Sequence, residues 1–497
     1  MNDNTTSTTF NWRDKRYSTF YRVVDQIVNE LQEMVWSDGK RKKRLKGDKL
    51  DSLHHSVEKL VSDTVSLVYS KKRRSNASIH KALGHYKHSR YNQNLSYRIH
   101  IHRAYDGMCD LGYLNLVLKG ASDGAHGKYL TRYEATPKLL SLFSAEEQEL
   151  CPVIIPHLPQ DETIRVQVNE IIEEEGKRPW KRTKTLDYEE TPEVVTMRSN
   201  LKVINDSLLR NWYDLELSDD AFLEMEQLLL NKDQTDISRQ LNLSRRTLHR
   251  VFNDVHFKTG GRFYGAWWQF VPKKYRSKLL VNGKRMVEYD YSNLHPTILY
   301  AEAGLTARED AYADILFPRS DCPKATGKGC RSAVKKAMNA MLNATKTMTR
   351  PPGGFKPSDY GTTWKELSSR ILKRHHKIAD KFYTGQGQRL QRIDSQIAEK
   401  VLLHFTKYGN AILPLHDSFL VHSGYEMELE EVMLTEFKKL FDVPIHVSKN
   451  TTKLNPQPAK DSIEDNSSGI NIESILESIN VGYEKRLDAF RNLRSIR

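Results

Sequence analysis

Apolar residues along the chain follow two spacings, and each spacing predicts a different kind of element. A helical spacing runs through residues 18–36, with apolar positions at Phe20, Val23, Val24, Ile27, Leu31 and Val35. Strand-like apolar runs surround two aspartates, Asp290 in Val-Glu-Tyr-Asp-Tyr-Ser and Asp417 in Leu-Pro-Leu-His-Asp-Ser-Phe-Leu-Val. We expect Asp290 at the end of a strand and Asp417 at the tip of a hairpin.

A helix with a basic and amide-bearing face is predicted between these two strands. Its polar residues recur every four positions, at Arg331, Lys335, Asn339 and Asn343, opposite an apolar face of Val334, Ala337, Met338 and Met341. Carboxylates can hold divalent metal ions, and Arg and Lys bind phosphate oxygens, so this order suits nucleotidyl transfer. If each segment stood alone, a polar hairpin tip and an ordinary basic surface helix would explain it equally.

The pattern therefore predicts functional roles for six residues. Asp290 and Asp417 are expected to bind metal and, together with Lys335, to be catalytic. The incoming nucleotide is expected to contact the polar face of the helix, namely Arg331, Lys335, Asn339 and Asn343.

Two segments of the N-terminal half resemble DNA-binding modules in their pattern. Residues 76–144 show helical stretches, an apolar alternation, a glycine-rich turn from Gly120 to Gly127 and a second strand, as in a winged helix. Such a domain binds either DNA or a protein, and both readings stay open. Residues 236–252 fit a helix-turn-helix whose second helix presents Arg245 and Arg246 to nucleic acid. A plain helical hairpin fits that segment equally well.

Composition supports a polyanionic partner and argues against a membrane protein. Among 497 residues, Lys and Arg number 77 and Asp and Glu 63, a net charge of +14. A merely soluble basic protein would show the same balance. The sequence has four cysteines, no apolar run of membrane-spanning length and no hydrophobic leader. We expect a cytoplasmic, nucleoid-associated protein with reduced thiols and no membrane contact.

Three of these segments resemble sequence motifs of a known superfamily. Asp290-Tyr291-Ser292, Arg331-x-x-x-Lys335 and His416-Asp417-Ser418 are similar, in this order, to motifs A, B and C of family A DNA polymerases and of the single-subunit RNA polymerases of phages and mitochondria. The third segment is similar to the RNA-polymerase form, because the DNA enzymes usually carry Glu at the position of Ser418. The resemblance covers roughly residues 255–445.

The resemblance implies further contacts with nucleic acid and nucleotide. Gly261-Arg262-Phe263-Tyr264 is similar to an element that lies near template and hybrid in the RNA enzymes, which implies nucleic-acid contacts for Arg262 and Tyr264. Similar contacts are implied for Gln396 and His416. His295 stands five positions after Asp290, where family A DNA enzymes carry a Glu that blocks the 2′-hydroxyl, so His295 is a candidate sugar gate within the nucleotide site.

Other positions depart from the family pattern or stay ambiguous. Asn343 replaces the Tyr that normally ends the motif B helix, and Ala344 replaces the following Gly. Trp267 and Trp268 follow the Arg262 element; either they stack on single-stranded bases or at least one packs in the core.

The resemblance implies an α+β fold, with a right-hand polymerase palm built on an antiparallel sheet, helical fingers, and helical and winged-helix-like modules before them. The expected domains are a basic helical segment, a winged-helix-like domain, a linker or arm, a helical region with the helix-turn-helix-like segment, palm and fingers, and a flexible linker with a terminal helix. Their boundaries are 1–75, 76–150, 151–197, 198–255, 256–450 and 451–497.

The expected function is template-directed DNA synthesis for a mobile or viral replicon. It would use a DNA template and primer, nucleoside triphosphates and two Mg²⁺ ions, with Mn²⁺ as a substitute. The first 250 residues contain no Asp-x-Glu segment that predicts a proofreading exonuclease. The alternatives are a single-subunit RNA polymerase or primase, a template-independent nucleotidyl transferase, and a non-enzymatic DNA-binding replication initiator.

Overall fold

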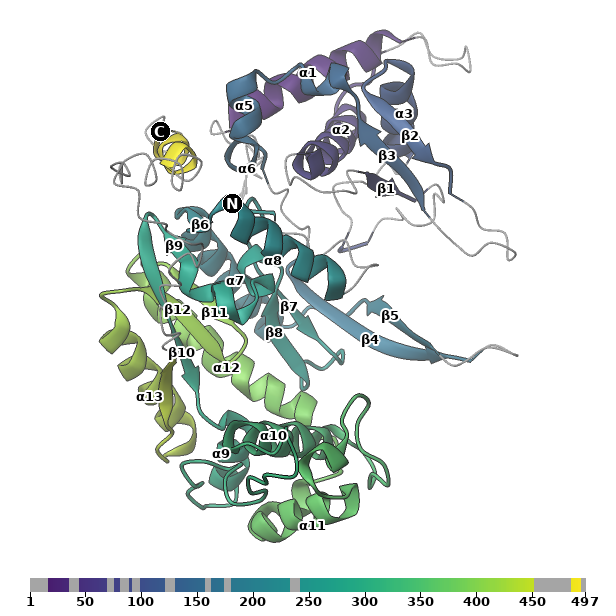
Figure 1. The fold of residues 1–497 in the computed structure, drawn as a ribbon. Helices are drawn as coiled ribbons and strands as arrows, with labels where there is room; N and C mark the ends of the chain where they lie inside the picture. Colours follow the sequence, from purple (N-terminus) through teal and green to yellow (C-terminus); the bar gives the residue numbers. More distant parts are fainter. Residues whose placement is uncertain are drawn as a thin grey trace, which may run out of the picture.

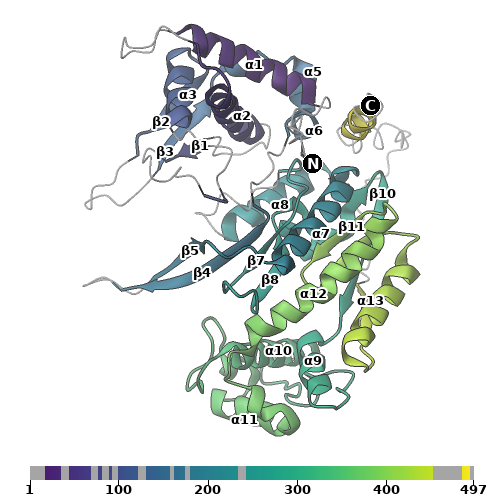
Figure 2. The same ribbon diagram turned by 180° about the vertical axis from the view of Figure 1, so that it is seen from behind.

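The chain folds into helices and three β-sheets, which confirms the mixed α+β class. The structure is a computed structural model, and it describes residues 17–34, 44–68, 76–80, 89–91, 99–120, 130–156, 162–173, 180–232, 242–450 and 484–492. Figures 1 and 2 show the N-terminal elements at one end of the molecule and the helices α9, α10 and α11 at the other.

An N-terminal unit combines helices with a small antiparallel sheet. Its helices are α1 (Ser18–Glu33), α2 (Asp48–Val68) and α3 (Ile99–Asp110), and its strands are β1 (Ala77–Ile79), β2 (Leu114–Leu118) and β3 (Thr131–Ala135) in the order β1-β3-β2. The antiparallel pairing of β2 with β3 confirms the predicted hairpin. Its glycine-rich tip lies outside the described residues, as do most of the two basic clusters of residues 40–46 and 71–74.

Packing in this unit crosses the predicted domain boundary at residue 75. Helix α2 packs against α3 and β3, and α1 packs against both α2 and α3. The apolar face predicted for residues 18–36 is therefore part of one core with the sheet, and Phe20, Val24 and Ile27 are fully buried there. Three short helices, α4 (Pro137–Leu140), α5 (Ala145–Glu149) and α6 (Cys151–Ile154), lead out of the unit.

The segment 151–197, which was predicted to be a linker or arm, contains two strands of a second sheet. Strands β4 (Ile164–Ile172), β5 (Trp180–Leu186), β7 (His249–Phe252) and β8 (Gly260–Tyr264) lie in the order β5-β4-β7-β8. Strand β4 pairs parallel to β7, and the other pairs are antiparallel. The many charges hid an alternation in which Ile164 and Val166 are buried and Arg165 is not.

The helix predicted for the second half of the helix-turn-helix-like segment is also wrong. Residues 249–252 form strand β7, in which Arg250 and Phe252 are buried alternately with more exposed neighbours. Ser244, which precedes this strand, makes a local turn, since its backbone N–H and its hydroxyl both donate to Oδ1 of Asn242. Residues 233–241, which include the start of the predicted motif, lie outside the described residues.

The third sheet is the centre of the C-terminal half. Its strands are β6 (Tyr213–Leu215), β9 (Leu279–Val281), β10 (Lys284–Tyr291), β11 (Ile412–Leu415) and β12 (Ser418–His422), in the order β11-β12-β10-β9-β6, and β13 (Val447–Asn450) also pairs with β10. All of these pairs are antiparallel. Because β6 belongs to this sheet, the unit predicted for 256–450 begins earlier in the chain.

Helices cover this sheet and extend from it. Helices α7 (Pro192–Leu209) and α8 (Asp219–Lys232) provide helical structure in the region predicted to be helical at 198–255, and α10 (Gly327–Asn343) contains the predicted basic helix. The remaining helices are α9 (Leu294–Glu302), α11 (Trp364–Arg374), α12 (Gln386–Lys407) and α13 (Glu426–Phe441), with 3-10 turns η4 (Trp267–Phe270), η5 (Lys273–Lys278), η6 (Pro357–Tyr360) and η7 (His376–Lys381). Long α12 packs against β8, β11, α7, α10 and α13 and so joins the second and third sheets to the outer helices (Figure 2).

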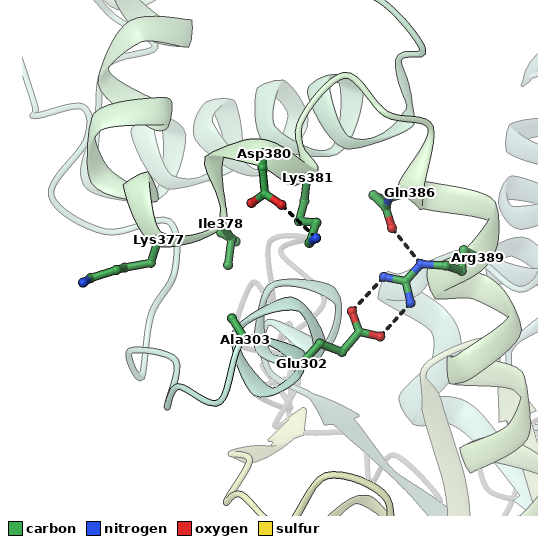
Figure 3. A pocket seen from close by; sticks show the side chains of 8 residues that line it. All are labelled: Glu302, Ala303, Lys377, Ile378, Asp380, Lys381, Gln386 and Arg389. Carbon is green, nitrogen blue, oxygen red and sulfur yellow. Dashed lines mark hydrogen bonds and ion pairs between the residues drawn. The ribbon is translucent and has the colours of Figure 1, made fainter.

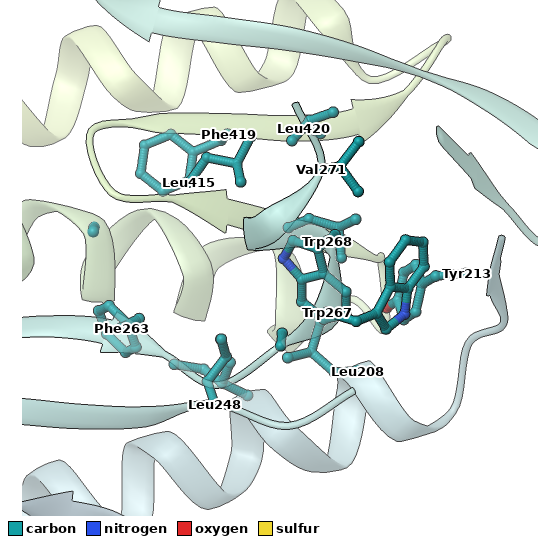
Figure 4. Close-up of a cluster of buried hydrophobic side chains, with 14 of the residues drawn as sticks. Leu208, Tyr213, Leu248, Phe263, Trp267, Trp268, Val271, Leu415, Phe419 and Leu420 are labelled. Carbon is teal, nitrogen blue, oxygen red and sulfur yellow. The ribbon is translucent and has the colours of Figure 1, made fainter. Parts of the chain in front are cut away.

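Aromatic residues fill the core between these sheets. Trp267 and Trp268 are both fully buried, with their ring centroids 6.2 Å apart. Figure 4 shows them among Tyr213, Phe263 and Phe419. Packing in the core is therefore the role of both tryptophans, and neither is placed to stack on single-stranded bases.

A terminal helix at residues 484–492 returns to the body of the molecule. Arg486 of this helix makes two hydrogen bonds, of 2.8 and 2.9 Å, to the buried carboxylate of Asp214, and the Phe490 ring packs against Trp212. The linker predicted for residues 451–472 lies outside the described residues. In the part of the chain that the structure covers, no helix combines the length and apolar character needed to cross a membrane.

Candidate active site

The central sheet brings the two predicted aspartates to adjoining strands. Asp290 lies near the end of β10, where it is the register partner of Ser418 on β12. Asp417 is the second residue of the two-residue turn between β11 and β12. The backbone N–H of Tyr291 donates to the carbonyl oxygen of Asp417 at 3.4 Å. Residues 127 positions apart in the sequence therefore share one edge of the site.

Asp290 is half-buried, and one oxygen of its carboxylate is buried without a hydrogen-bond partner. Its Oδ1 atom is shielded from solvent and has no hydrogen-bond partner among the described residues. Burial and, next, the negative charge of Asp417 raise the pKa of Asp290 to about 7, while the charge of Lys335 acts in the opposite direction. Two carboxylates that repel each other in a poorly solvated place favour protonation of one of them or a bound cation.

Unusual backbone conformations hold both aspartates in place. His416, which precedes Asp417, has a φ of +66°, and Asn293, three residues after Asp290, has a φ of +56°. His and Asn are among the side chains found more often than most in this left-handed region. Asn293 is further fixed by a 2.6 Å hydrogen bond from Nδ2 to the carbonyl oxygen of Glu309. Such conformations cluster where surrounding structure fixes a functional side chain.

The donor atoms suit a hard divalent cation such as Mg²⁺. Only carboxylate oxygens are offered by the aspartate pair, and one of them is the unpartnered Oδ1 of Asp290. Within the ranges that the structure describes, no group of three or more His, Cys, Asp or Glu side chains could hold a metal ion. A magnesium site here would therefore rest on two carboxylates and complete its shell with water and substrate phosphates, as is usual for this ion.

Of the two predicted basic residues of α10, Lys335 lies near the aspartate pair and Arg331 pairs with another acid. Nε of Arg331 lies 2.7 Å from Oδ2 of Asp310, and the Arg331 guanidinium lies 5.2 Å from the ring centre of Tyr312. Nζ of Lys335 lies 5.9 Å from the same ring and is close enough to Asp290 to lower the pKa of that carboxyl. The structure thus brings Lys335 together with the aspartate pair, as the sequence predicted.

The two asparagines of α10 are placed farther along the helix. Nδ2 of Asn343 donates to the carbonyl oxygen of Asn339 at 2.7 Å, so Asn343 is tied to its own helix. Its side chain also lies against Gly387 at the start of α12, where any Cβ would come within 1.8 Å of Oδ1. Asn343 is exposed and Asn339 half-buried, and their predicted contact with the nucleotide stays a prediction.

A second charged cluster borders the aspartate pair. Asp394 on α12 accepts hydrogen bonds from Arg262 on β8, including one of 3.0 Å from Nε to Oδ2. Nε2 of His295, in the first turn of α9, lies 3.1 Å from the same oxygen. Burial opposes the charge on Arg262, but the hydrogen bonds that Arg262 donates to Asp394 and the negative charges of Asp394 and Asp417 outweigh burial and raise the pKa of Arg262.

The predicted nucleic-acid residues Tyr264 and His416 are part of the same edge. Their rings are 5.3 Å apart in an edge-to-face arrangement. Burial, and then the nearby charge of Arg262, lower the pKa of His416. Gly261 precedes Arg262 with a φ of +87°, and any Cβ there would approach the Phe252 ring at 2.6 Å and Oγ of Ser395 at 2.9 Å. Glycine at this position lets α12 approach β8 and places Asp394 beside Arg262.

Other predicted nucleic-acid residues lie apart from this cluster. Gln396 is exposed on α12. Arg246 is buried, and its Nη1 donates to the carbonyl oxygen of Asn211 at 2.9 Å, so the predicted nucleic-acid contact is wrong for this side chain. Arg245 lies in the segment before β7 and not on a recognition helix, so the reason for its predicted contact is lost.

Four residues of the site were missed by sequence analysis. Tyr312 is buried beneath Arg331 and Lys335, and the charges of Asp417 and Asp290 help burial to raise its pKa. Lys273 lowers the pKa of Asp290. Glu288, two residues before Asp290, accepts a 3.0 Å hydrogen bond from Ser418 and forms a 3.0 Å ion pair with Arg276. Asp394 is the fourth. Of these four residues, only Glu288 could have been predicted from the sequence, because residues two apart in a strand point to the same face of the sheet.

A surface pocket of about 490 Å³ lies elsewhere, between α9, η7 and the start of α12. Figure 3 shows two ion pairs in its wall: Arg389 reaches both oxygens of Glu302, at 2.6 and 2.8 Å, and Lys381 pairs with Asp380. None of the predicted site residues lines it, so the aspartate edge, and not this pocket, is the candidate site.

Comparison of the chain with protein-family models found no matching family, and comparison with curated proteins found no similar sequence.

Proposed function

We propose that this chain is a template-directed nucleic-acid polymerase, specifically a DNA polymerase of a mobile or viral replicon. The observation that carries the proposal is the half-buried pair of Asp290 and Asp417 beside the basic face of α10, in which Oδ1 of Asp290 is shielded from solvent and has no hydrogen-bond partner among the described residues. Acidic ligands for metal next to cations for phosphate are what nucleotidyl transfer requires of a protein.

The aspartates would hold divalent ions at the end of the central sheet. Bound there, magnesium would lower the pKa of a primer 3′-hydroxyl and neutralise charge on the leaving pyrophosphate. Asp290 and Asp417 contribute rigid positioning, because strand pairing and the left-handed backbone of His416 fix both carboxylates before a ligand arrives.

Helix α10 would hold the triphosphate of the incoming nucleotide. Lys335 is exposed and lies close enough to influence Asp290 electrostatically, which suits a contact with phosphate oxygens. Arg331 is also exposed but paired with Asp310, so a phosphate would compete with that carboxylate for the guanidinium. The Tyr312 ring lies near both cations and limits where they can reach.

The N-terminal unit would recruit the enzyme to DNA. Its sheet order β1-β3-β2, with α3 before the β2–β3 hairpin, is compatible with a winged helix. The excess of 14 positive charges over the chain supports a polyanionic partner.

RNA synthesis, as by a single-subunit RNA polymerase or primase, is a second candidate. It is favoured by Ser418, which stands after Asp417 where a DNA enzyme of family A would carry Glu. Ser418 is buried and donates to Glu288, so its position leaves no room for an added acidic ligand without rearrangement.

Primer extension tests the proposal. A labelled primer on a DNA template is incubated with Mg²⁺ and either dNTPs or NTPs, with Asp417→Ala as the control. Extension with dNTPs that is lost in Asp417→Ala is the expected result. Products made from NTPs, or without a primer, would favour the second candidate. Tails made without template would indicate a terminal transferase, and DNA binding without synthesis would indicate a non-enzymatic initiator.

A further inference from the structure

Strands β4 and β5 continue beyond the second sheet as a two-stranded ribbon. The parallel pairing of β4 with β7 covers residues 164–166, whereas its antiparallel pairing with β5 runs on to Ile172. Six register pairs, about 20 Å of strand, therefore extend beyond the last register pair with β7. Figures 1 and 2 both show the two strands projecting from the body of the molecule. A two-stranded ribbon is at best marginally stable by itself in water, so a partner would stabilise this one.

One face of the ribbon carries amide and hydroxyl side chains. Gln167 on β4 is the register partner of Thr185 on β5. Asn169 is the register partner of Thr183, whose Oγ1 donates to Oδ1 of Asn169 at 3.0 Å. Because residues two apart point to the same face of a strand, Ile171 shares this face, and it is 64% exposed. The two threonines and Asn169 are exposed as well, so the face is open to a ligand and its central amide is already oriented.

The opposite face of the ribbon is charged. Arg182 and Lys184 on β5 share this face with Glu170 on β4, and Nζ of Lys184 lies 3.1 Å from Oε1 of Glu170. Both basic side chains are exposed, and the sequence of β5 contains no acid. In the described part of the chain, β5 is the edge strand of its sheet. Basic side chains on an edge strand oppose the addition of another strand and favour a polyanionic partner.

Duplex DNA fits both faces of the ribbon. A two-stranded β-ribbon fits in the major groove of B-DNA, which is about 12 Å wide and 8.5 Å deep, but not in the narrow major groove of duplex RNA. Asn and Gln make paired hydrogen bonds to the edge of adenine, and methyl groups such as that of Thr pack against the methyl group of thymine. With the amide face on the floor of the groove, the long side chains of Arg182 and Lys184 lie near the height of the phosphates.

We propose that the β4–β5 ribbon reads A·T base pairs in the major groove of duplex DNA through its amide face, while Arg182 binds phosphate. This goes beyond the proposed function, because it concerns where the chain binds DNA and not how a nucleotide is added. The sheet of the ribbon also contains β8, whose Arg262 is influenced by the charge of Asp417. The ribbon is therefore joined to the candidate site through one sheet.

The test is a selection of DNA duplexes by the full-length protein. The chain is incubated with a random pool of duplexes, and the bound DNA is sequenced. We expect enrichment of a site with A·T pairs at fixed positions, which Asn169→Ala should bind about tenfold more weakly, with unchanged affinity for a scrambled duplex. Arg182→Ala should weaken binding to all duplexes alike and lower the salt slope by about one. Glu170→Gln, on the charged face, is the matched control and should leave the preferred sequence unchanged.

A cross-link identifies the part of the chain that reads the site. 5-Iododeoxyuridine replaces each thymine of the enriched site in turn and carries iodine in place of the methyl group in the major groove. We expect irradiation to link it to a peptide from residues 164–172 or 180–186. Links confined to the N-terminal unit, no enrichment by the wild type, an unchanged preference in Asn169→Ala, or preferential binding of duplex RNA would each overturn the proposal. Absence of synthesis by the wild type, with the sequence preference retained, would overturn the proposed function alone, because this test uses neither metal nor nucleotide.

Discussion

Glu399 and Asp290, two acids on either side of helix α12, differ in whether the fold gives them a partner of opposite charge. On the side of the second sheet, Glu399 is matched by Arg250 at 2.8 Å, within a core closed by Asn200 and Ser395. On the side of the central sheet, Asp290 has a buried oxygen without a partner and faces Asp417. Folding alone favours the first arrangement, because an unpaired buried charge is costly. The second arrangement is the one that the proposed divalent cation would stabilise.

The largest expected effect is on catalysis and comes from the unpaired acids. Asp290→Asn or Asp417→Asn should reduce primer extension about 1,000-fold or more, since each removes a charged ligand from a two-metal reaction. Neither change should lower the free energy of unfolding, because each relieves repulsion between the carboxylates. Rapid-quench kinetics and urea denaturation measure the two quantities. A variant that is inactive only because it is unfolded would contradict this account.

A change at Glu399, which is paired with Arg250, should lower stability and leave activity nearly unchanged. Glu399→Gln leaves the fully buried Arg250 without its counter-ion; burial lowers the pKa of Arg250, and the charge of Glu399 opposes that shift. Breaking such a pair should lower the free energy of unfolding by about 3–5 kcal/mol. Extension at a temperature where the variant stays folded should remain within about threefold of wild type, because Glu399 contacts no reacting group. A large loss of kcat in a fully folded variant would show that Glu399 contributes to catalysis and not only to stability.

The dependence of stability on pH should report the raised pKa of Asp290 directly. Asp290 has a pKa of about 7 in the fold, against a usual value near 4 for an unfolded chain. Between these values the folded state binds more protons than the unfolded state, so the free energy of unfolding falls as pH rises through this window. Asp290→Asn should remove on the order of 2 kcal/mol of that fall between pH 4.5 and 8, in chelator. Parallel curves for the two proteins would mean that Asp290 ionises normally.

The smallest expected effect belongs to the exposed cation of the site. Lys335→Ala should raise the KM for the nucleotide about tenfold, the loss of one charge-assisted contact, with a smaller change in kcat. Lys336→Ala is the matched control, because Lys336 is the neighbouring exposed lysine but lies near Gly354 and Phe355 on the other side of the helix. Equal effects of the two changes would mean that α10 acts only through its general positive charge.

Local sequence patterns were sufficient for the parts of the site that lie on regular elements. Asp290 and Asp417 each interrupt an apolar run, which marks a polar residue at a strand end or turn. The four-residue spacing from Arg331 to Asn343 identified one face of α10 because helical geometry maps sequence spacing onto position. These inferences needed no knowledge of which segments meet in space.

The parts of the site that could not be predicted depend on contacts between segments that lie far apart in the sequence. Nothing in the sequence around Asp394 distinguishes it from a solvent-exposed acid of a charged helix, and its partners lie 132 and 99 residues away. Tyr312 comes from an irregular segment without periodicity. Residues 244–252 were misread because their charges suggested a recognition helix, whereas the fold buries Arg250 and Phe252 on alternate positions of a strand. Local sequence patterns do not predict which charged residues are buried against partners from distant segments.

The central claim is that Asp290 and Asp417 form a divalent metal site, and metal-directed cleavage of the chain tests it most directly. Fe²⁺ with ascorbate generates radicals that cut the backbone next to a bound ion, and the fragments are identified by mass spectrometry. We expect cuts near residues 290 and 417, suppressed by excess Mg²⁺ and lost in the variant carrying both Asp290→Asn and Asp417→Asn. No cleavage at these two segments, or cleavage that persists in the double variant, would contradict the account.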